Sequence, residues 1–200
     1  GSRGEGGTAQ VLLGPMAFAD ILENAFVPST FGDQVQKGRS SLAGRIGEEV
    51  AEECLKIVDD GLFPGGMATS SFDGEGVPSQ RTTLVEGGIL RSYLYDTYSA
   101  GKEPTETKST GNADRPGYAG LPRIGTTNLT VSSVDPEDVL AEMDRGYLVT
   151  GVIGAHTANP ISGDFSVEAR NVFVVEDGAA EKPIRSLMLA GNVFDLLSSI

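Results

Sequence analysis

Apolar positions recur with a helical period near the start of the chain. Between residues 17 and 26 they fall at i, i+1, i+4, i+5, i+8 and i+9, which is one face of a helix. We expect this helix to open at Gly14-Pro15, because proline suits the first helical position, and to end at Pro28. Residues 11–13 in front of it predict a short strand. The stripe consists of Ala17, Phe18, Ile21, Leu22, Ala25 and Phe26.

Two later regions have the pattern of β-hairpins. Residues 80–86 and 89–95 favour β structure and flank Gly87-Gly88, a two-residue loop suited to a type I′ or II′ turn. Residues 165–176 and 182–189 flank a longer turn that contains Asp177-Gly178. Further strands are expected at 55–58, 127–133 and 147–153, the first of them followed by a turn at 59–61.

The remaining segments predict short helices and long polar loops. Helices are expected at 48–54, at 97–101, from Pro136 onward and from residue 192 to the end. Residues 63–78 and 102–123 are the long loops. Together these elements predict an α+β fold with a mostly antiparallel or mixed sheet, open or curled toward a barrel, and a few short flanking helices.

Length and composition fit one folded domain with an N-terminal arm. Residues 1–10 are Gly-rich and polar, so we expect a disordered arm, with Gly1-Ser2 as the remnant of a tag. Residues 11–200 then form the domain. The apolar side chains of the last segment need a partner, so we expect a fragment of a longer natural protein.

Charge and apolar runs narrow the class of function. The formal net charge is −13 and Lys and Arg are scattered singly, which disfavours direct binding to nucleic acid. No apolar run reaches the roughly 18 residues of a membrane span, and the N-terminus has no signal-peptide core. One cysteine is compatible with a reducing compartment, and we expect a cytoplasmic protein without a membrane partner.

The Gly-rich stretch TGVIGAHTANPISGDFS at 150–166 holds the single histidine, His156. One His and one Cys cannot supply a zinc site of the usual composition, and an HExxH motif is impossible. His156 could act as a general base, bind a ligand by hydrogen bonding or be structural, and the structural interpretation is favoured. Asp164 is eight residues away and could orient it.

Other candidate chemistry is weaker. Cys54 follows an acidic segment expected to be helical, which disfavours a thiolate, so we expect a structural role. The chain has no GxSxG elbow, phosphate-binding loop or EF-hand spacing. Residues 73–76, DGEG, therefore predict a turn.

Six stretches in fixed order resemble the C-terminal part of the TldD/PmbA family. They are IVDDGLFPGG at 57–66, SFDGEGVPSQRTTLVEGGILRSYLYDTYSA at 71–100, STGNADR at 109–115, LPRIGTTNLTV at 121–131, GAHTANPISGDFSVEARNVFVVEDG at 154–178 and PIRSLMLAGNVFDLL at 183–197. Family members are known as modulators of DNA gyrase and as two-subunit zinc metallopeptidases. TldD-type subunits carry an HExxxH zinc motif upstream of this region and a cysteine motif near the end, and PmbA (TldE) subunits lack the zinc motif.

The sequences GAHTANP and SGDFS are similar to those of the PmbA branch. The resemblance implies a non-catalytic subunit with no metal or other cofactor of its own and no catalytic residue, and zinc in a TldD-like partner. Self-association is the other expected pairing. The implied substrate is an unfolded peptide that binds in extended form, by strand addition. Expected peptide-chamber or loop residues are His156, Asn159, Asp164, Ser109, Thr110 and Asn112.

Two alternatives stay open from the sequence. The chain could belong to an active subunit whose zinc motif lies upstream, with His156 or Asp164 contributing to the metal centre. It could also be a non-enzymatic regulator of DNA gyrase, whose acidic surface mimics nucleic acid toward a basic partner.

Overall fold

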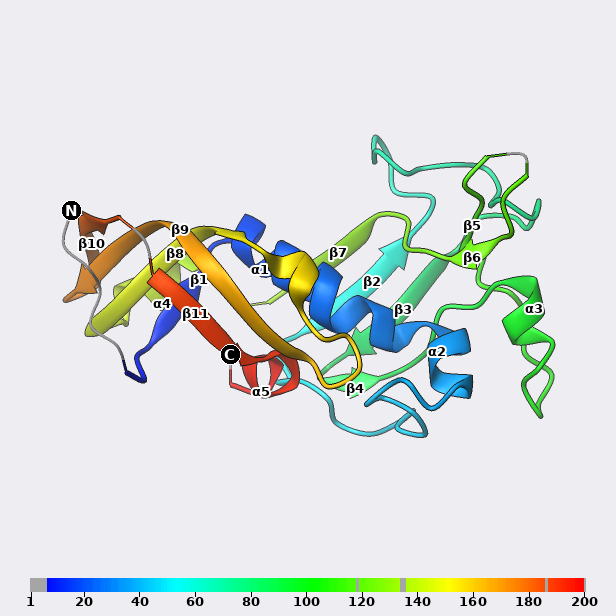
Figure 1. Ribbon diagram of the computed structural model, residues 1–200, viewed down its shortest axis with the longest axis horizontal. Coiled ribbons are helices and arrows are strands. Elements are labelled where there is room, and N and C mark those ends of the chain that lie inside the picture. The colour runs from blue at the N-terminus through cyan, green and yellow to red at the C-terminus, as the bar shows by residue number, and fades with distance from the viewer. Residues whose placement is uncertain (1–6, 118, 134–135, 186, 200) are drawn as a thin grey trace. The chain divides into compact units, whose positions relative to one another are not determined.

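The chain folds as two compact units in the computed structural model, which describes residues 7–117, 119–133, 136–185 and 187–199. Unit 1 comprises residues 1–26 and 134–196, and unit 2 comprises residues 27–133 and 197–200. Figure 1 labels the elements of both units. Of the arm expected at 1–10, residues 1–6 lie outside the described residues. The carbonyl of Gln10 already accepts a hydrogen bond from the Tyr147 amide, so the last residue of that stretch joins the sheet.

Unit 1 contains a mixed sheet centred on one long strand. Strand β9 (Asp164–Glu176) pairs antiparallel with β8 (Arg145–Ile153) along one side. On its other side it pairs with β10 (Ala179–Ile184) and then with β11 (Leu187–Asn192), as Figure 1 shows. The short strand β1 (Val11–Leu13) runs parallel to β8.

The apolar stripe near the N-terminus packs on this sheet. Helix α1 (Pro15–Ile21) lies against β8 and continues as a π-helical segment, η1 (Leu22–Phe26). A 3-10 segment, η2 (Val27–Thr30), follows at the start of unit 2. Pro28 therefore does not end helical backbone as predicted, because the first turn of a new helical segment needs no proline N–H. Five of the six stripe residues are buried: Ala17, Ile21, Leu22, Ala25 and Phe26.

The other short helices of unit 1 are α4 (Pro136–Ala141), the 3-10 turn η3 (Ala155–Thr157) and α5 (Val193–Leu197). The helix expected from Pro136 is confirmed by α4. The helix expected from residue 192 to the end is present as α5, which ends at Leu197. None of the described helices is long and apolar enough to span a bilayer.

Unit 2 contains an antiparallel sheet in the order β4-β3-β2-β7. Its strands are β4 (Ile89–Leu90), β3 (Arg81–Glu86), β2 (Lys56–Asp60) and β7 (Leu129–Ser132). A second ladder joins β5 (Ala113–Asp114) to β6 (Arg123–Ile124). Helices α2 (Gly32–Gln36) and α3 (Thr97–Ala100) complete the unit. The core includes Leu55, Ile57, Leu84, Leu90 and Leu94, all fully buried.

Both predicted hairpins form, and both turn at two residues with positive φ. Gly87 and Gly88 have φ of 61° and 71°, the signs that a type I′ turn requires. Asp177 and Gly178 have φ of 49° and 75° and join β9 to β10 in the same way. The second turn is therefore shorter than expected, and residues 182–189 contribute to two strands, β10 and β11, that both pair with β9.

Three expectations are corrected. Residues 48–54 form no helix, because the amides of Val50 and Ala51 donate to the Gly88 carbonyl of the hairpin and not along the segment. Strand β2 extends through Asp60, so residues 59–61 are not a turn as a whole. The sheets formed by the described residues are open, with edge strands, so no barrel closes. The α+β class with mixed and antiparallel sheets is confirmed.

Candidate functional site

The Gly-rich corner between β8 and β9 is a tightly hydrogen-bonded turn. Gly154 adopts φ of 93° where β8 ends, and η3 follows. The side-chain oxygen of Asn159 then accepts from the amides of Ile161 and Ser162, at 3.0 and 3.4 Å. The Asn159 amide donates to the carbonyl of Asp164 at 2.8 Å, which closes the loop where β9 begins. The corner is therefore held by hydrogen bonds from both its backbone and the Asn159 side chain.

Asn192, at the end of β11, joins this corner to the neighbouring strand. Its side-chain amide donates to the carbonyl of Ser162 at 2.8 Å and to the carboxylate of Asp164 at 2.9 Å. The Ser162 hydroxyl donates to the same carboxylate at 2.7 Å. These hydrogen bonds from Ser162 and then Asn192 hold the pKa of Asp164 below its ordinary value. Asp164 is thus an exposed carboxylate engaged on both oxygens.

His156 lies at the surface of η3 and is exposed. Within the described part of the chain, its side chain makes no hydrogen bond or ion pair. Among the described residues no hydrogen bond or ion pair joins His156 to Asp164, whose two oxygens accept from Ser162 and Asn192.

The donor set near this corner does not fit zinc by itself. Zinc sites combine His, Cys and carboxylate ligands at tetrahedral spacing. Among the described residues, no three His, Cys, Asp or Glu side chains come together in a group that could hold a metal ion. Cys54 belongs to unit 2, where it is exposed in a turn and not at the end of a helix as predicted.

The other three predicted residues, Ser109, Thr110 and Asn112, lie together in unit 2. The hydroxyls of Ser109 and Thr110 both donate to the carbonyl of Tyr95 at 3.1 Å. The Tyr95 amide donates back to the Thr110 oxygen at 2.8 Å. Gly111 follows with φ of 73°, and a Cβ there would lie 2.7 Å from the Pro78 carbonyl oxygen. This close packing turns Asn112 into the interior.

Asn112 reaches a buried carboxylate on β2. Its amide donates to Asp59 at 2.6 Å and to the Gly125 carbonyl at 3.0 Å. Thr127 donates to the same carboxylate through its backbone amide at 2.7 Å and its hydroxyl at 2.9 Å. Asp59 is only 1% exposed. It therefore ties the segments around residues 112 and 127 to the centre of the sheet.

Burial dominates the electrostatics of Asp59. Loss of solvent raises its pKa above the ordinary value, although the bonds from Asn112 and Thr127 act in the opposite direction. The side-chain oxygen of Asn112 is buried and has no hydrogen-bond partner among the described residues. Turning the Asn112 amide over would bring this oxygen against the Asp59 carboxylate, so the observed orientation is the favourable one while Asp59 is ionised.

The turn expected at 73–76 is also present. One oxygen of Asp73 accepts from the amides of Glu75 and Val77, both at 2.9 Å. Its other oxygen accepts from the Ala113 amide at 3.0 Å, which joins this turn to β5. Both oxygens of the Asp73 carboxylate therefore accept hydrogen bonds from backbone amides.

The structure thus divides the six predicted residues between two units. His156, Asn159 and Asp164 belong to unit 1, and Ser109, Thr110 and Asn112 belong to unit 2. Sequence reasoning missed the partners Asn192, Asp59 and Thr127. The signal for Asp59 was its position directly after the apolar Ile57-Val58, where strand continuation predicts burial.

The sequence of the chain matches that of a known protein family. The model of the "PmbA/TldA metallopeptidase C-terminal domain" matches residues 6–200. The uncharacterized protein MJ0231 of Methanocaldococcus jannaschii is 40% identical over 93% of this chain and 43% of its own length. A metalloprotease TldD homolog of Buchnera aphidicola subsp. Acyrthosiphon pisum is 30% identical over 97% of this chain and 40% of its own.

A solved structure has the same fold. The crystal structure of TldE from Thermococcus kodakarensis superposes with a TM-score of 0.84 at 34% identity, covering 95% of this chain and 43% of that chain. The chain therefore spans less than half the length of the relatives that it matches. Names from both branches, TldD and TldE, occur among them. The chain belongs to the PmbA/TldD metallopeptidase family and represents its C-terminal domain.

Proposed function

We propose that this chain is the C-terminal domain of a PmbA/TldE-like subunit that contributes no catalytic group and works with a TldD-like zinc subunit on unfolded peptides. The observation that carries the proposal is the state of the corner at 154–164. Its carboxylate, Asp164, is engaged by Ser162 and Asn192, and its histidine, His156, stands apart and exposed. In this proposal the corner shapes the peptide chamber, and neither side chain takes part in catalysis. The resemblance of GAHTANPISGDFS to the PmbA branch supports the same assignment.

Strand β11 offers an edge where an extended peptide could bind. Among the described strands it pairs only with β9, and its sequence LMLAGN carries no charge and no proline. The other free edge of this sheet side, β10, carries Lys182, Pro183 and a register shift near Glu181, all features that discourage strand addition. A peptide added to β11 would continue the ladder through main-chain hydrogen bonds, with little dependence on its sequence.

Full-length protein tests the catalytic assignment. We expect the purified subunit to hold less than stoichiometric zinc and to cleave an unfolded peptide only when the TldD-like subunit is added. His156→Ala should leave kcat of the pair unchanged, because the proposal gives His156 no catalytic role. Removing a general acid or base would lower kcat by roughly 100-fold or more. Stoichiometric zinc together with cleavage by the subunit alone would refute the proposal. A loss of kcat near 100-fold in folded His156→Ala would instead place this chain in an active subunit.

Main-chain chemistry tests the peptide edge separately. One peptide is N-methylated at alternate amides and a second at the intervening amides, so that both have the same composition. Strand addition predicts that only the peptide whose methyl groups point toward β11 loses binding, because the other set of amides faces solvent. Equal binding of both peptides would exclude the edge as the binding site.

A further inference from the structure

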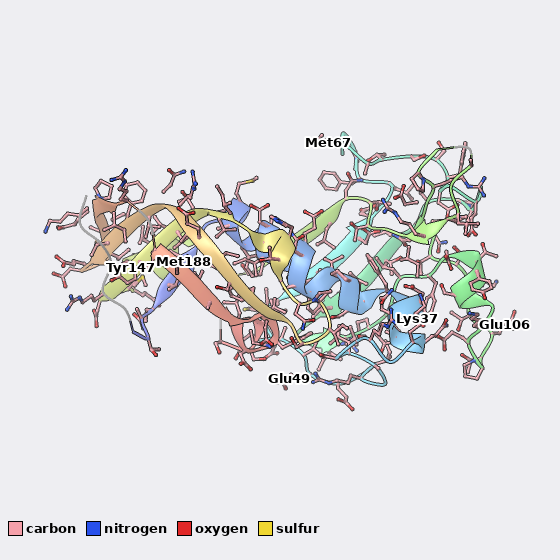
Figure 2. The ribbon with its side chains drawn as sticks, viewed as in Figure 1. Lys37, Glu49, Met67, Glu106, Tyr147 and Met188 are labelled. Carbon is pink, nitrogen blue, oxygen red and sulfur yellow. The ribbon has the colours of Figure 1, made fainter. Side chains whose placement is uncertain are left out.

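Unit 2 contains a groove of about 870 Å³ between α2, α3 and β6. Charged side chains alternate with apolar ones around it, and Lys37, which Figure 2 labels, lines it just after α2. The volume lies within the range of sites for small ligands, so the charges on the walls decide which ligand fits. The apolar part of the walls consists of Phe31, Tyr98, Pro104, Pro122 and Ile124.

Two of the cations that line the groove are neutralised within the chain. Lys37 pairs with Asp33 at 2.7 Å, and Arg123 pairs with Asp114 at 2.8 Å. A ligand in the groove would therefore meet these four side chains as ion pairs and not as single charges.

Lys102 is a third cation in the groove, and it lies against an aromatic ring. Its ammonium group is 4.0 Å from the centre of the Tyr98 ring, and no carboxylate among the described residues pairs with it. The face of the Tyr98 ring thus accepts an ammonium group, because the π electrons give it negative charge. Tyr98 is 69% exposed, so a ligand can reach the same ring.

Asp96 is a buried carboxylate of the groove without a cation. It is 7% exposed, and one of its oxygens accepts from the Ser99 amide at 2.7 Å, which caps α3. Its other oxygen accepts no hydrogen bond from the described part of the chain. Little water surrounds this carboxylate, so an ammonium group that enters the groove would be attracted to it strongly.

Glu103 supplies a second negative charge to the groove. Its carboxylate accepts from the Gln36 amide at 2.8 Å and from the Tyr95 hydroxyl at 3.2 Å, and both donors are neutral. Burial, and then the negative charge of Glu103, raises the pKa of Tyr95. This end of the groove is therefore negative, with no cation paired to Glu103 among the described residues.

The two carboxylates lie on either side of α3. After the helix, the amides of Lys102 and Glu103 donate to the carbonyls of Ser99 and Ala100, which continues the helical path for one more turn. Seven positions along such a path separate the backbones of Asp96 and Glu103 by roughly 10–14 Å. A ligand that reaches both carboxylates therefore needs two positive charges joined by a flexible spacer.

We propose that this groove binds an aliphatic polyamine, with one ammonium group at Asp96, another at Glu103 and the carbon chain against Tyr98 and the apolar walls. Charge selects this occupant. An anionic ligand would be repelled by both carboxylates, and a neutral one would leave both without a cation. The net charge of −13 also attracts cations to the molecule. This inference concerns unit 2 and does not depend on the catalytic role proposed above.

Calorimetric titration of the 200-residue chain with spermidine in about 0.1 M salt, which screens long-range attraction, tests the site. Asp96→Asn keeps an oxygen to cap α3, and Glu103→Gln keeps an acceptor for Tyr95. Each variant should bind at least about tenfold more weakly, because hydrogen bonds to charged groups are strong. Glu53→Gln is the matched control, since it removes an exposed charge of unit 2 outside the groove and should bind like wild type. Thermal unfolding confirms that each variant is folded.

A ligand with one blocked end tests the contact at two points. N-acetylspermidine lacks one terminal charge, so wild type should prefer spermidine, and Asp96→Asn and Glu103→Gln should lose most of that preference. Lys102→Met removes the competing cation on the Tyr98 ring and should tighten binding about two- to fivefold, the effect of one exposed charge.

Equal binding of spermidine by wild type, Asp96→Asn and Glu103→Gln would reveal only a general attraction to an acidic chain and would overturn the proposal. Absence of binding at millimolar spermidine would do the same. Full-length protein should bind spermidine as the 200-residue chain does, and a full-length protein that does not bind would also refute the site. None of these results involves zinc or peptide cleavage, so they leave the proposed function untouched.

Discussion

At the scale of single residues, Asp59 joins three segments of unit 2 through hydrogen bonds. Its carboxylate accepts three hydrogen bonds, one from Asn112 and two from Thr127, in a buried position. Asp59→Leu would leave these donors unsatisfied, each at a cost of about 1–3 kcal/mol. We expect the free energy of unfolding, measured in urea, to fall by roughly 3 kcal/mol or more.

The matched variant Asp59→Asn should be much milder. Its amide can donate to the oxygen of Asn112 once the Asn112 amide turns over, while its own oxygen still accepts from the Thr127 amide. This turn gives up the bond from Asn112 to the Gly125 carbonyl. We expect a loss of about 1 kcal/mol. Equal destabilisation by Leu and Asn would show that the hydrogen-bond network is not what stabilises this site.

The raised pKa of Asp59 predicts a dependence on pH with a definite sign. Because the folded pKa lies above the ordinary 3.8, the folded state holds this proton more tightly than the unfolded state. The contribution of Asp59 to the free energy of unfolding therefore falls as pH rises from 3.8 through the raised pKa. Wild type should be most stable relative to Asp59→Asn at the acid end, and urea titrations across that range check it. A stability difference between wild type and Asp59→Asn that stayed constant with pH would contradict the raised pKa of Asp59.

Large sequence separations limit how well contacts between single residues can be predicted from the sequence. The resemblance singled out Asn112, and the structure gives it a partner. That partner, Asp59, is 53 residues away and Thr127 is 68 residues from Asp59. Loop closure over such distances is set by the whole unit. No local pattern could therefore have joined the three.

At the scale of elements, the β3–β4 hairpin was predictable from local sequence, whereas the segment 48–54 that packs against it was not. Its strands and turn were predictable, because alternation and Gly87-Gly88 are contained in one short stretch. The failed helix at 48–54 sits against the same turn, where Val50 and Ala51 donate to Gly88. The helix propensity of residues 48–54 is outweighed by these hydrogen bonds to Gly88, which is more than 35 residues away.

This contact makes the two turn glycines unequal. Both have positive φ, so alanine at either position costs about 1–2 kcal/mol in backbone strain. Among the described residues, a Cβ at Gly87 would meet no atom within 4 Å, whereas a Cβ at Gly88 would overlap the Ala51 carbonyl oxygen. We expect Gly87→Ala to lose only the strain energy and Gly88→Ala to lose clearly more, with thermal unfolding as the measurement. Equal losses would show that residues 50–51 move aside at no cost.

The corner of unit 1 gives a second prediction about an element. Asn192→Ala removes the two bonds to Ser162 and Asp164, and their loss should appear as faster amide exchange at 159–164. Asn192→Asp should be worse at neutral pH, because it places a second carboxylate beside Asp164. If both variants exchanged like wild type, the corner would have to be held by its backbone alone.

At the scale of the whole molecule, chain order does not reveal the two units. Unit 1 combines residues from both ends of the chain, and unit 2 is built mainly from the middle. Sequence reasoning expected one domain over 11–200, and the family match does run across nearly the whole chain. Division into units depends on which strands pair, and the parallel pairing of β1 with β8 joins residues more than 130 positions apart. Such a pairing leaves no periodic signature in either segment.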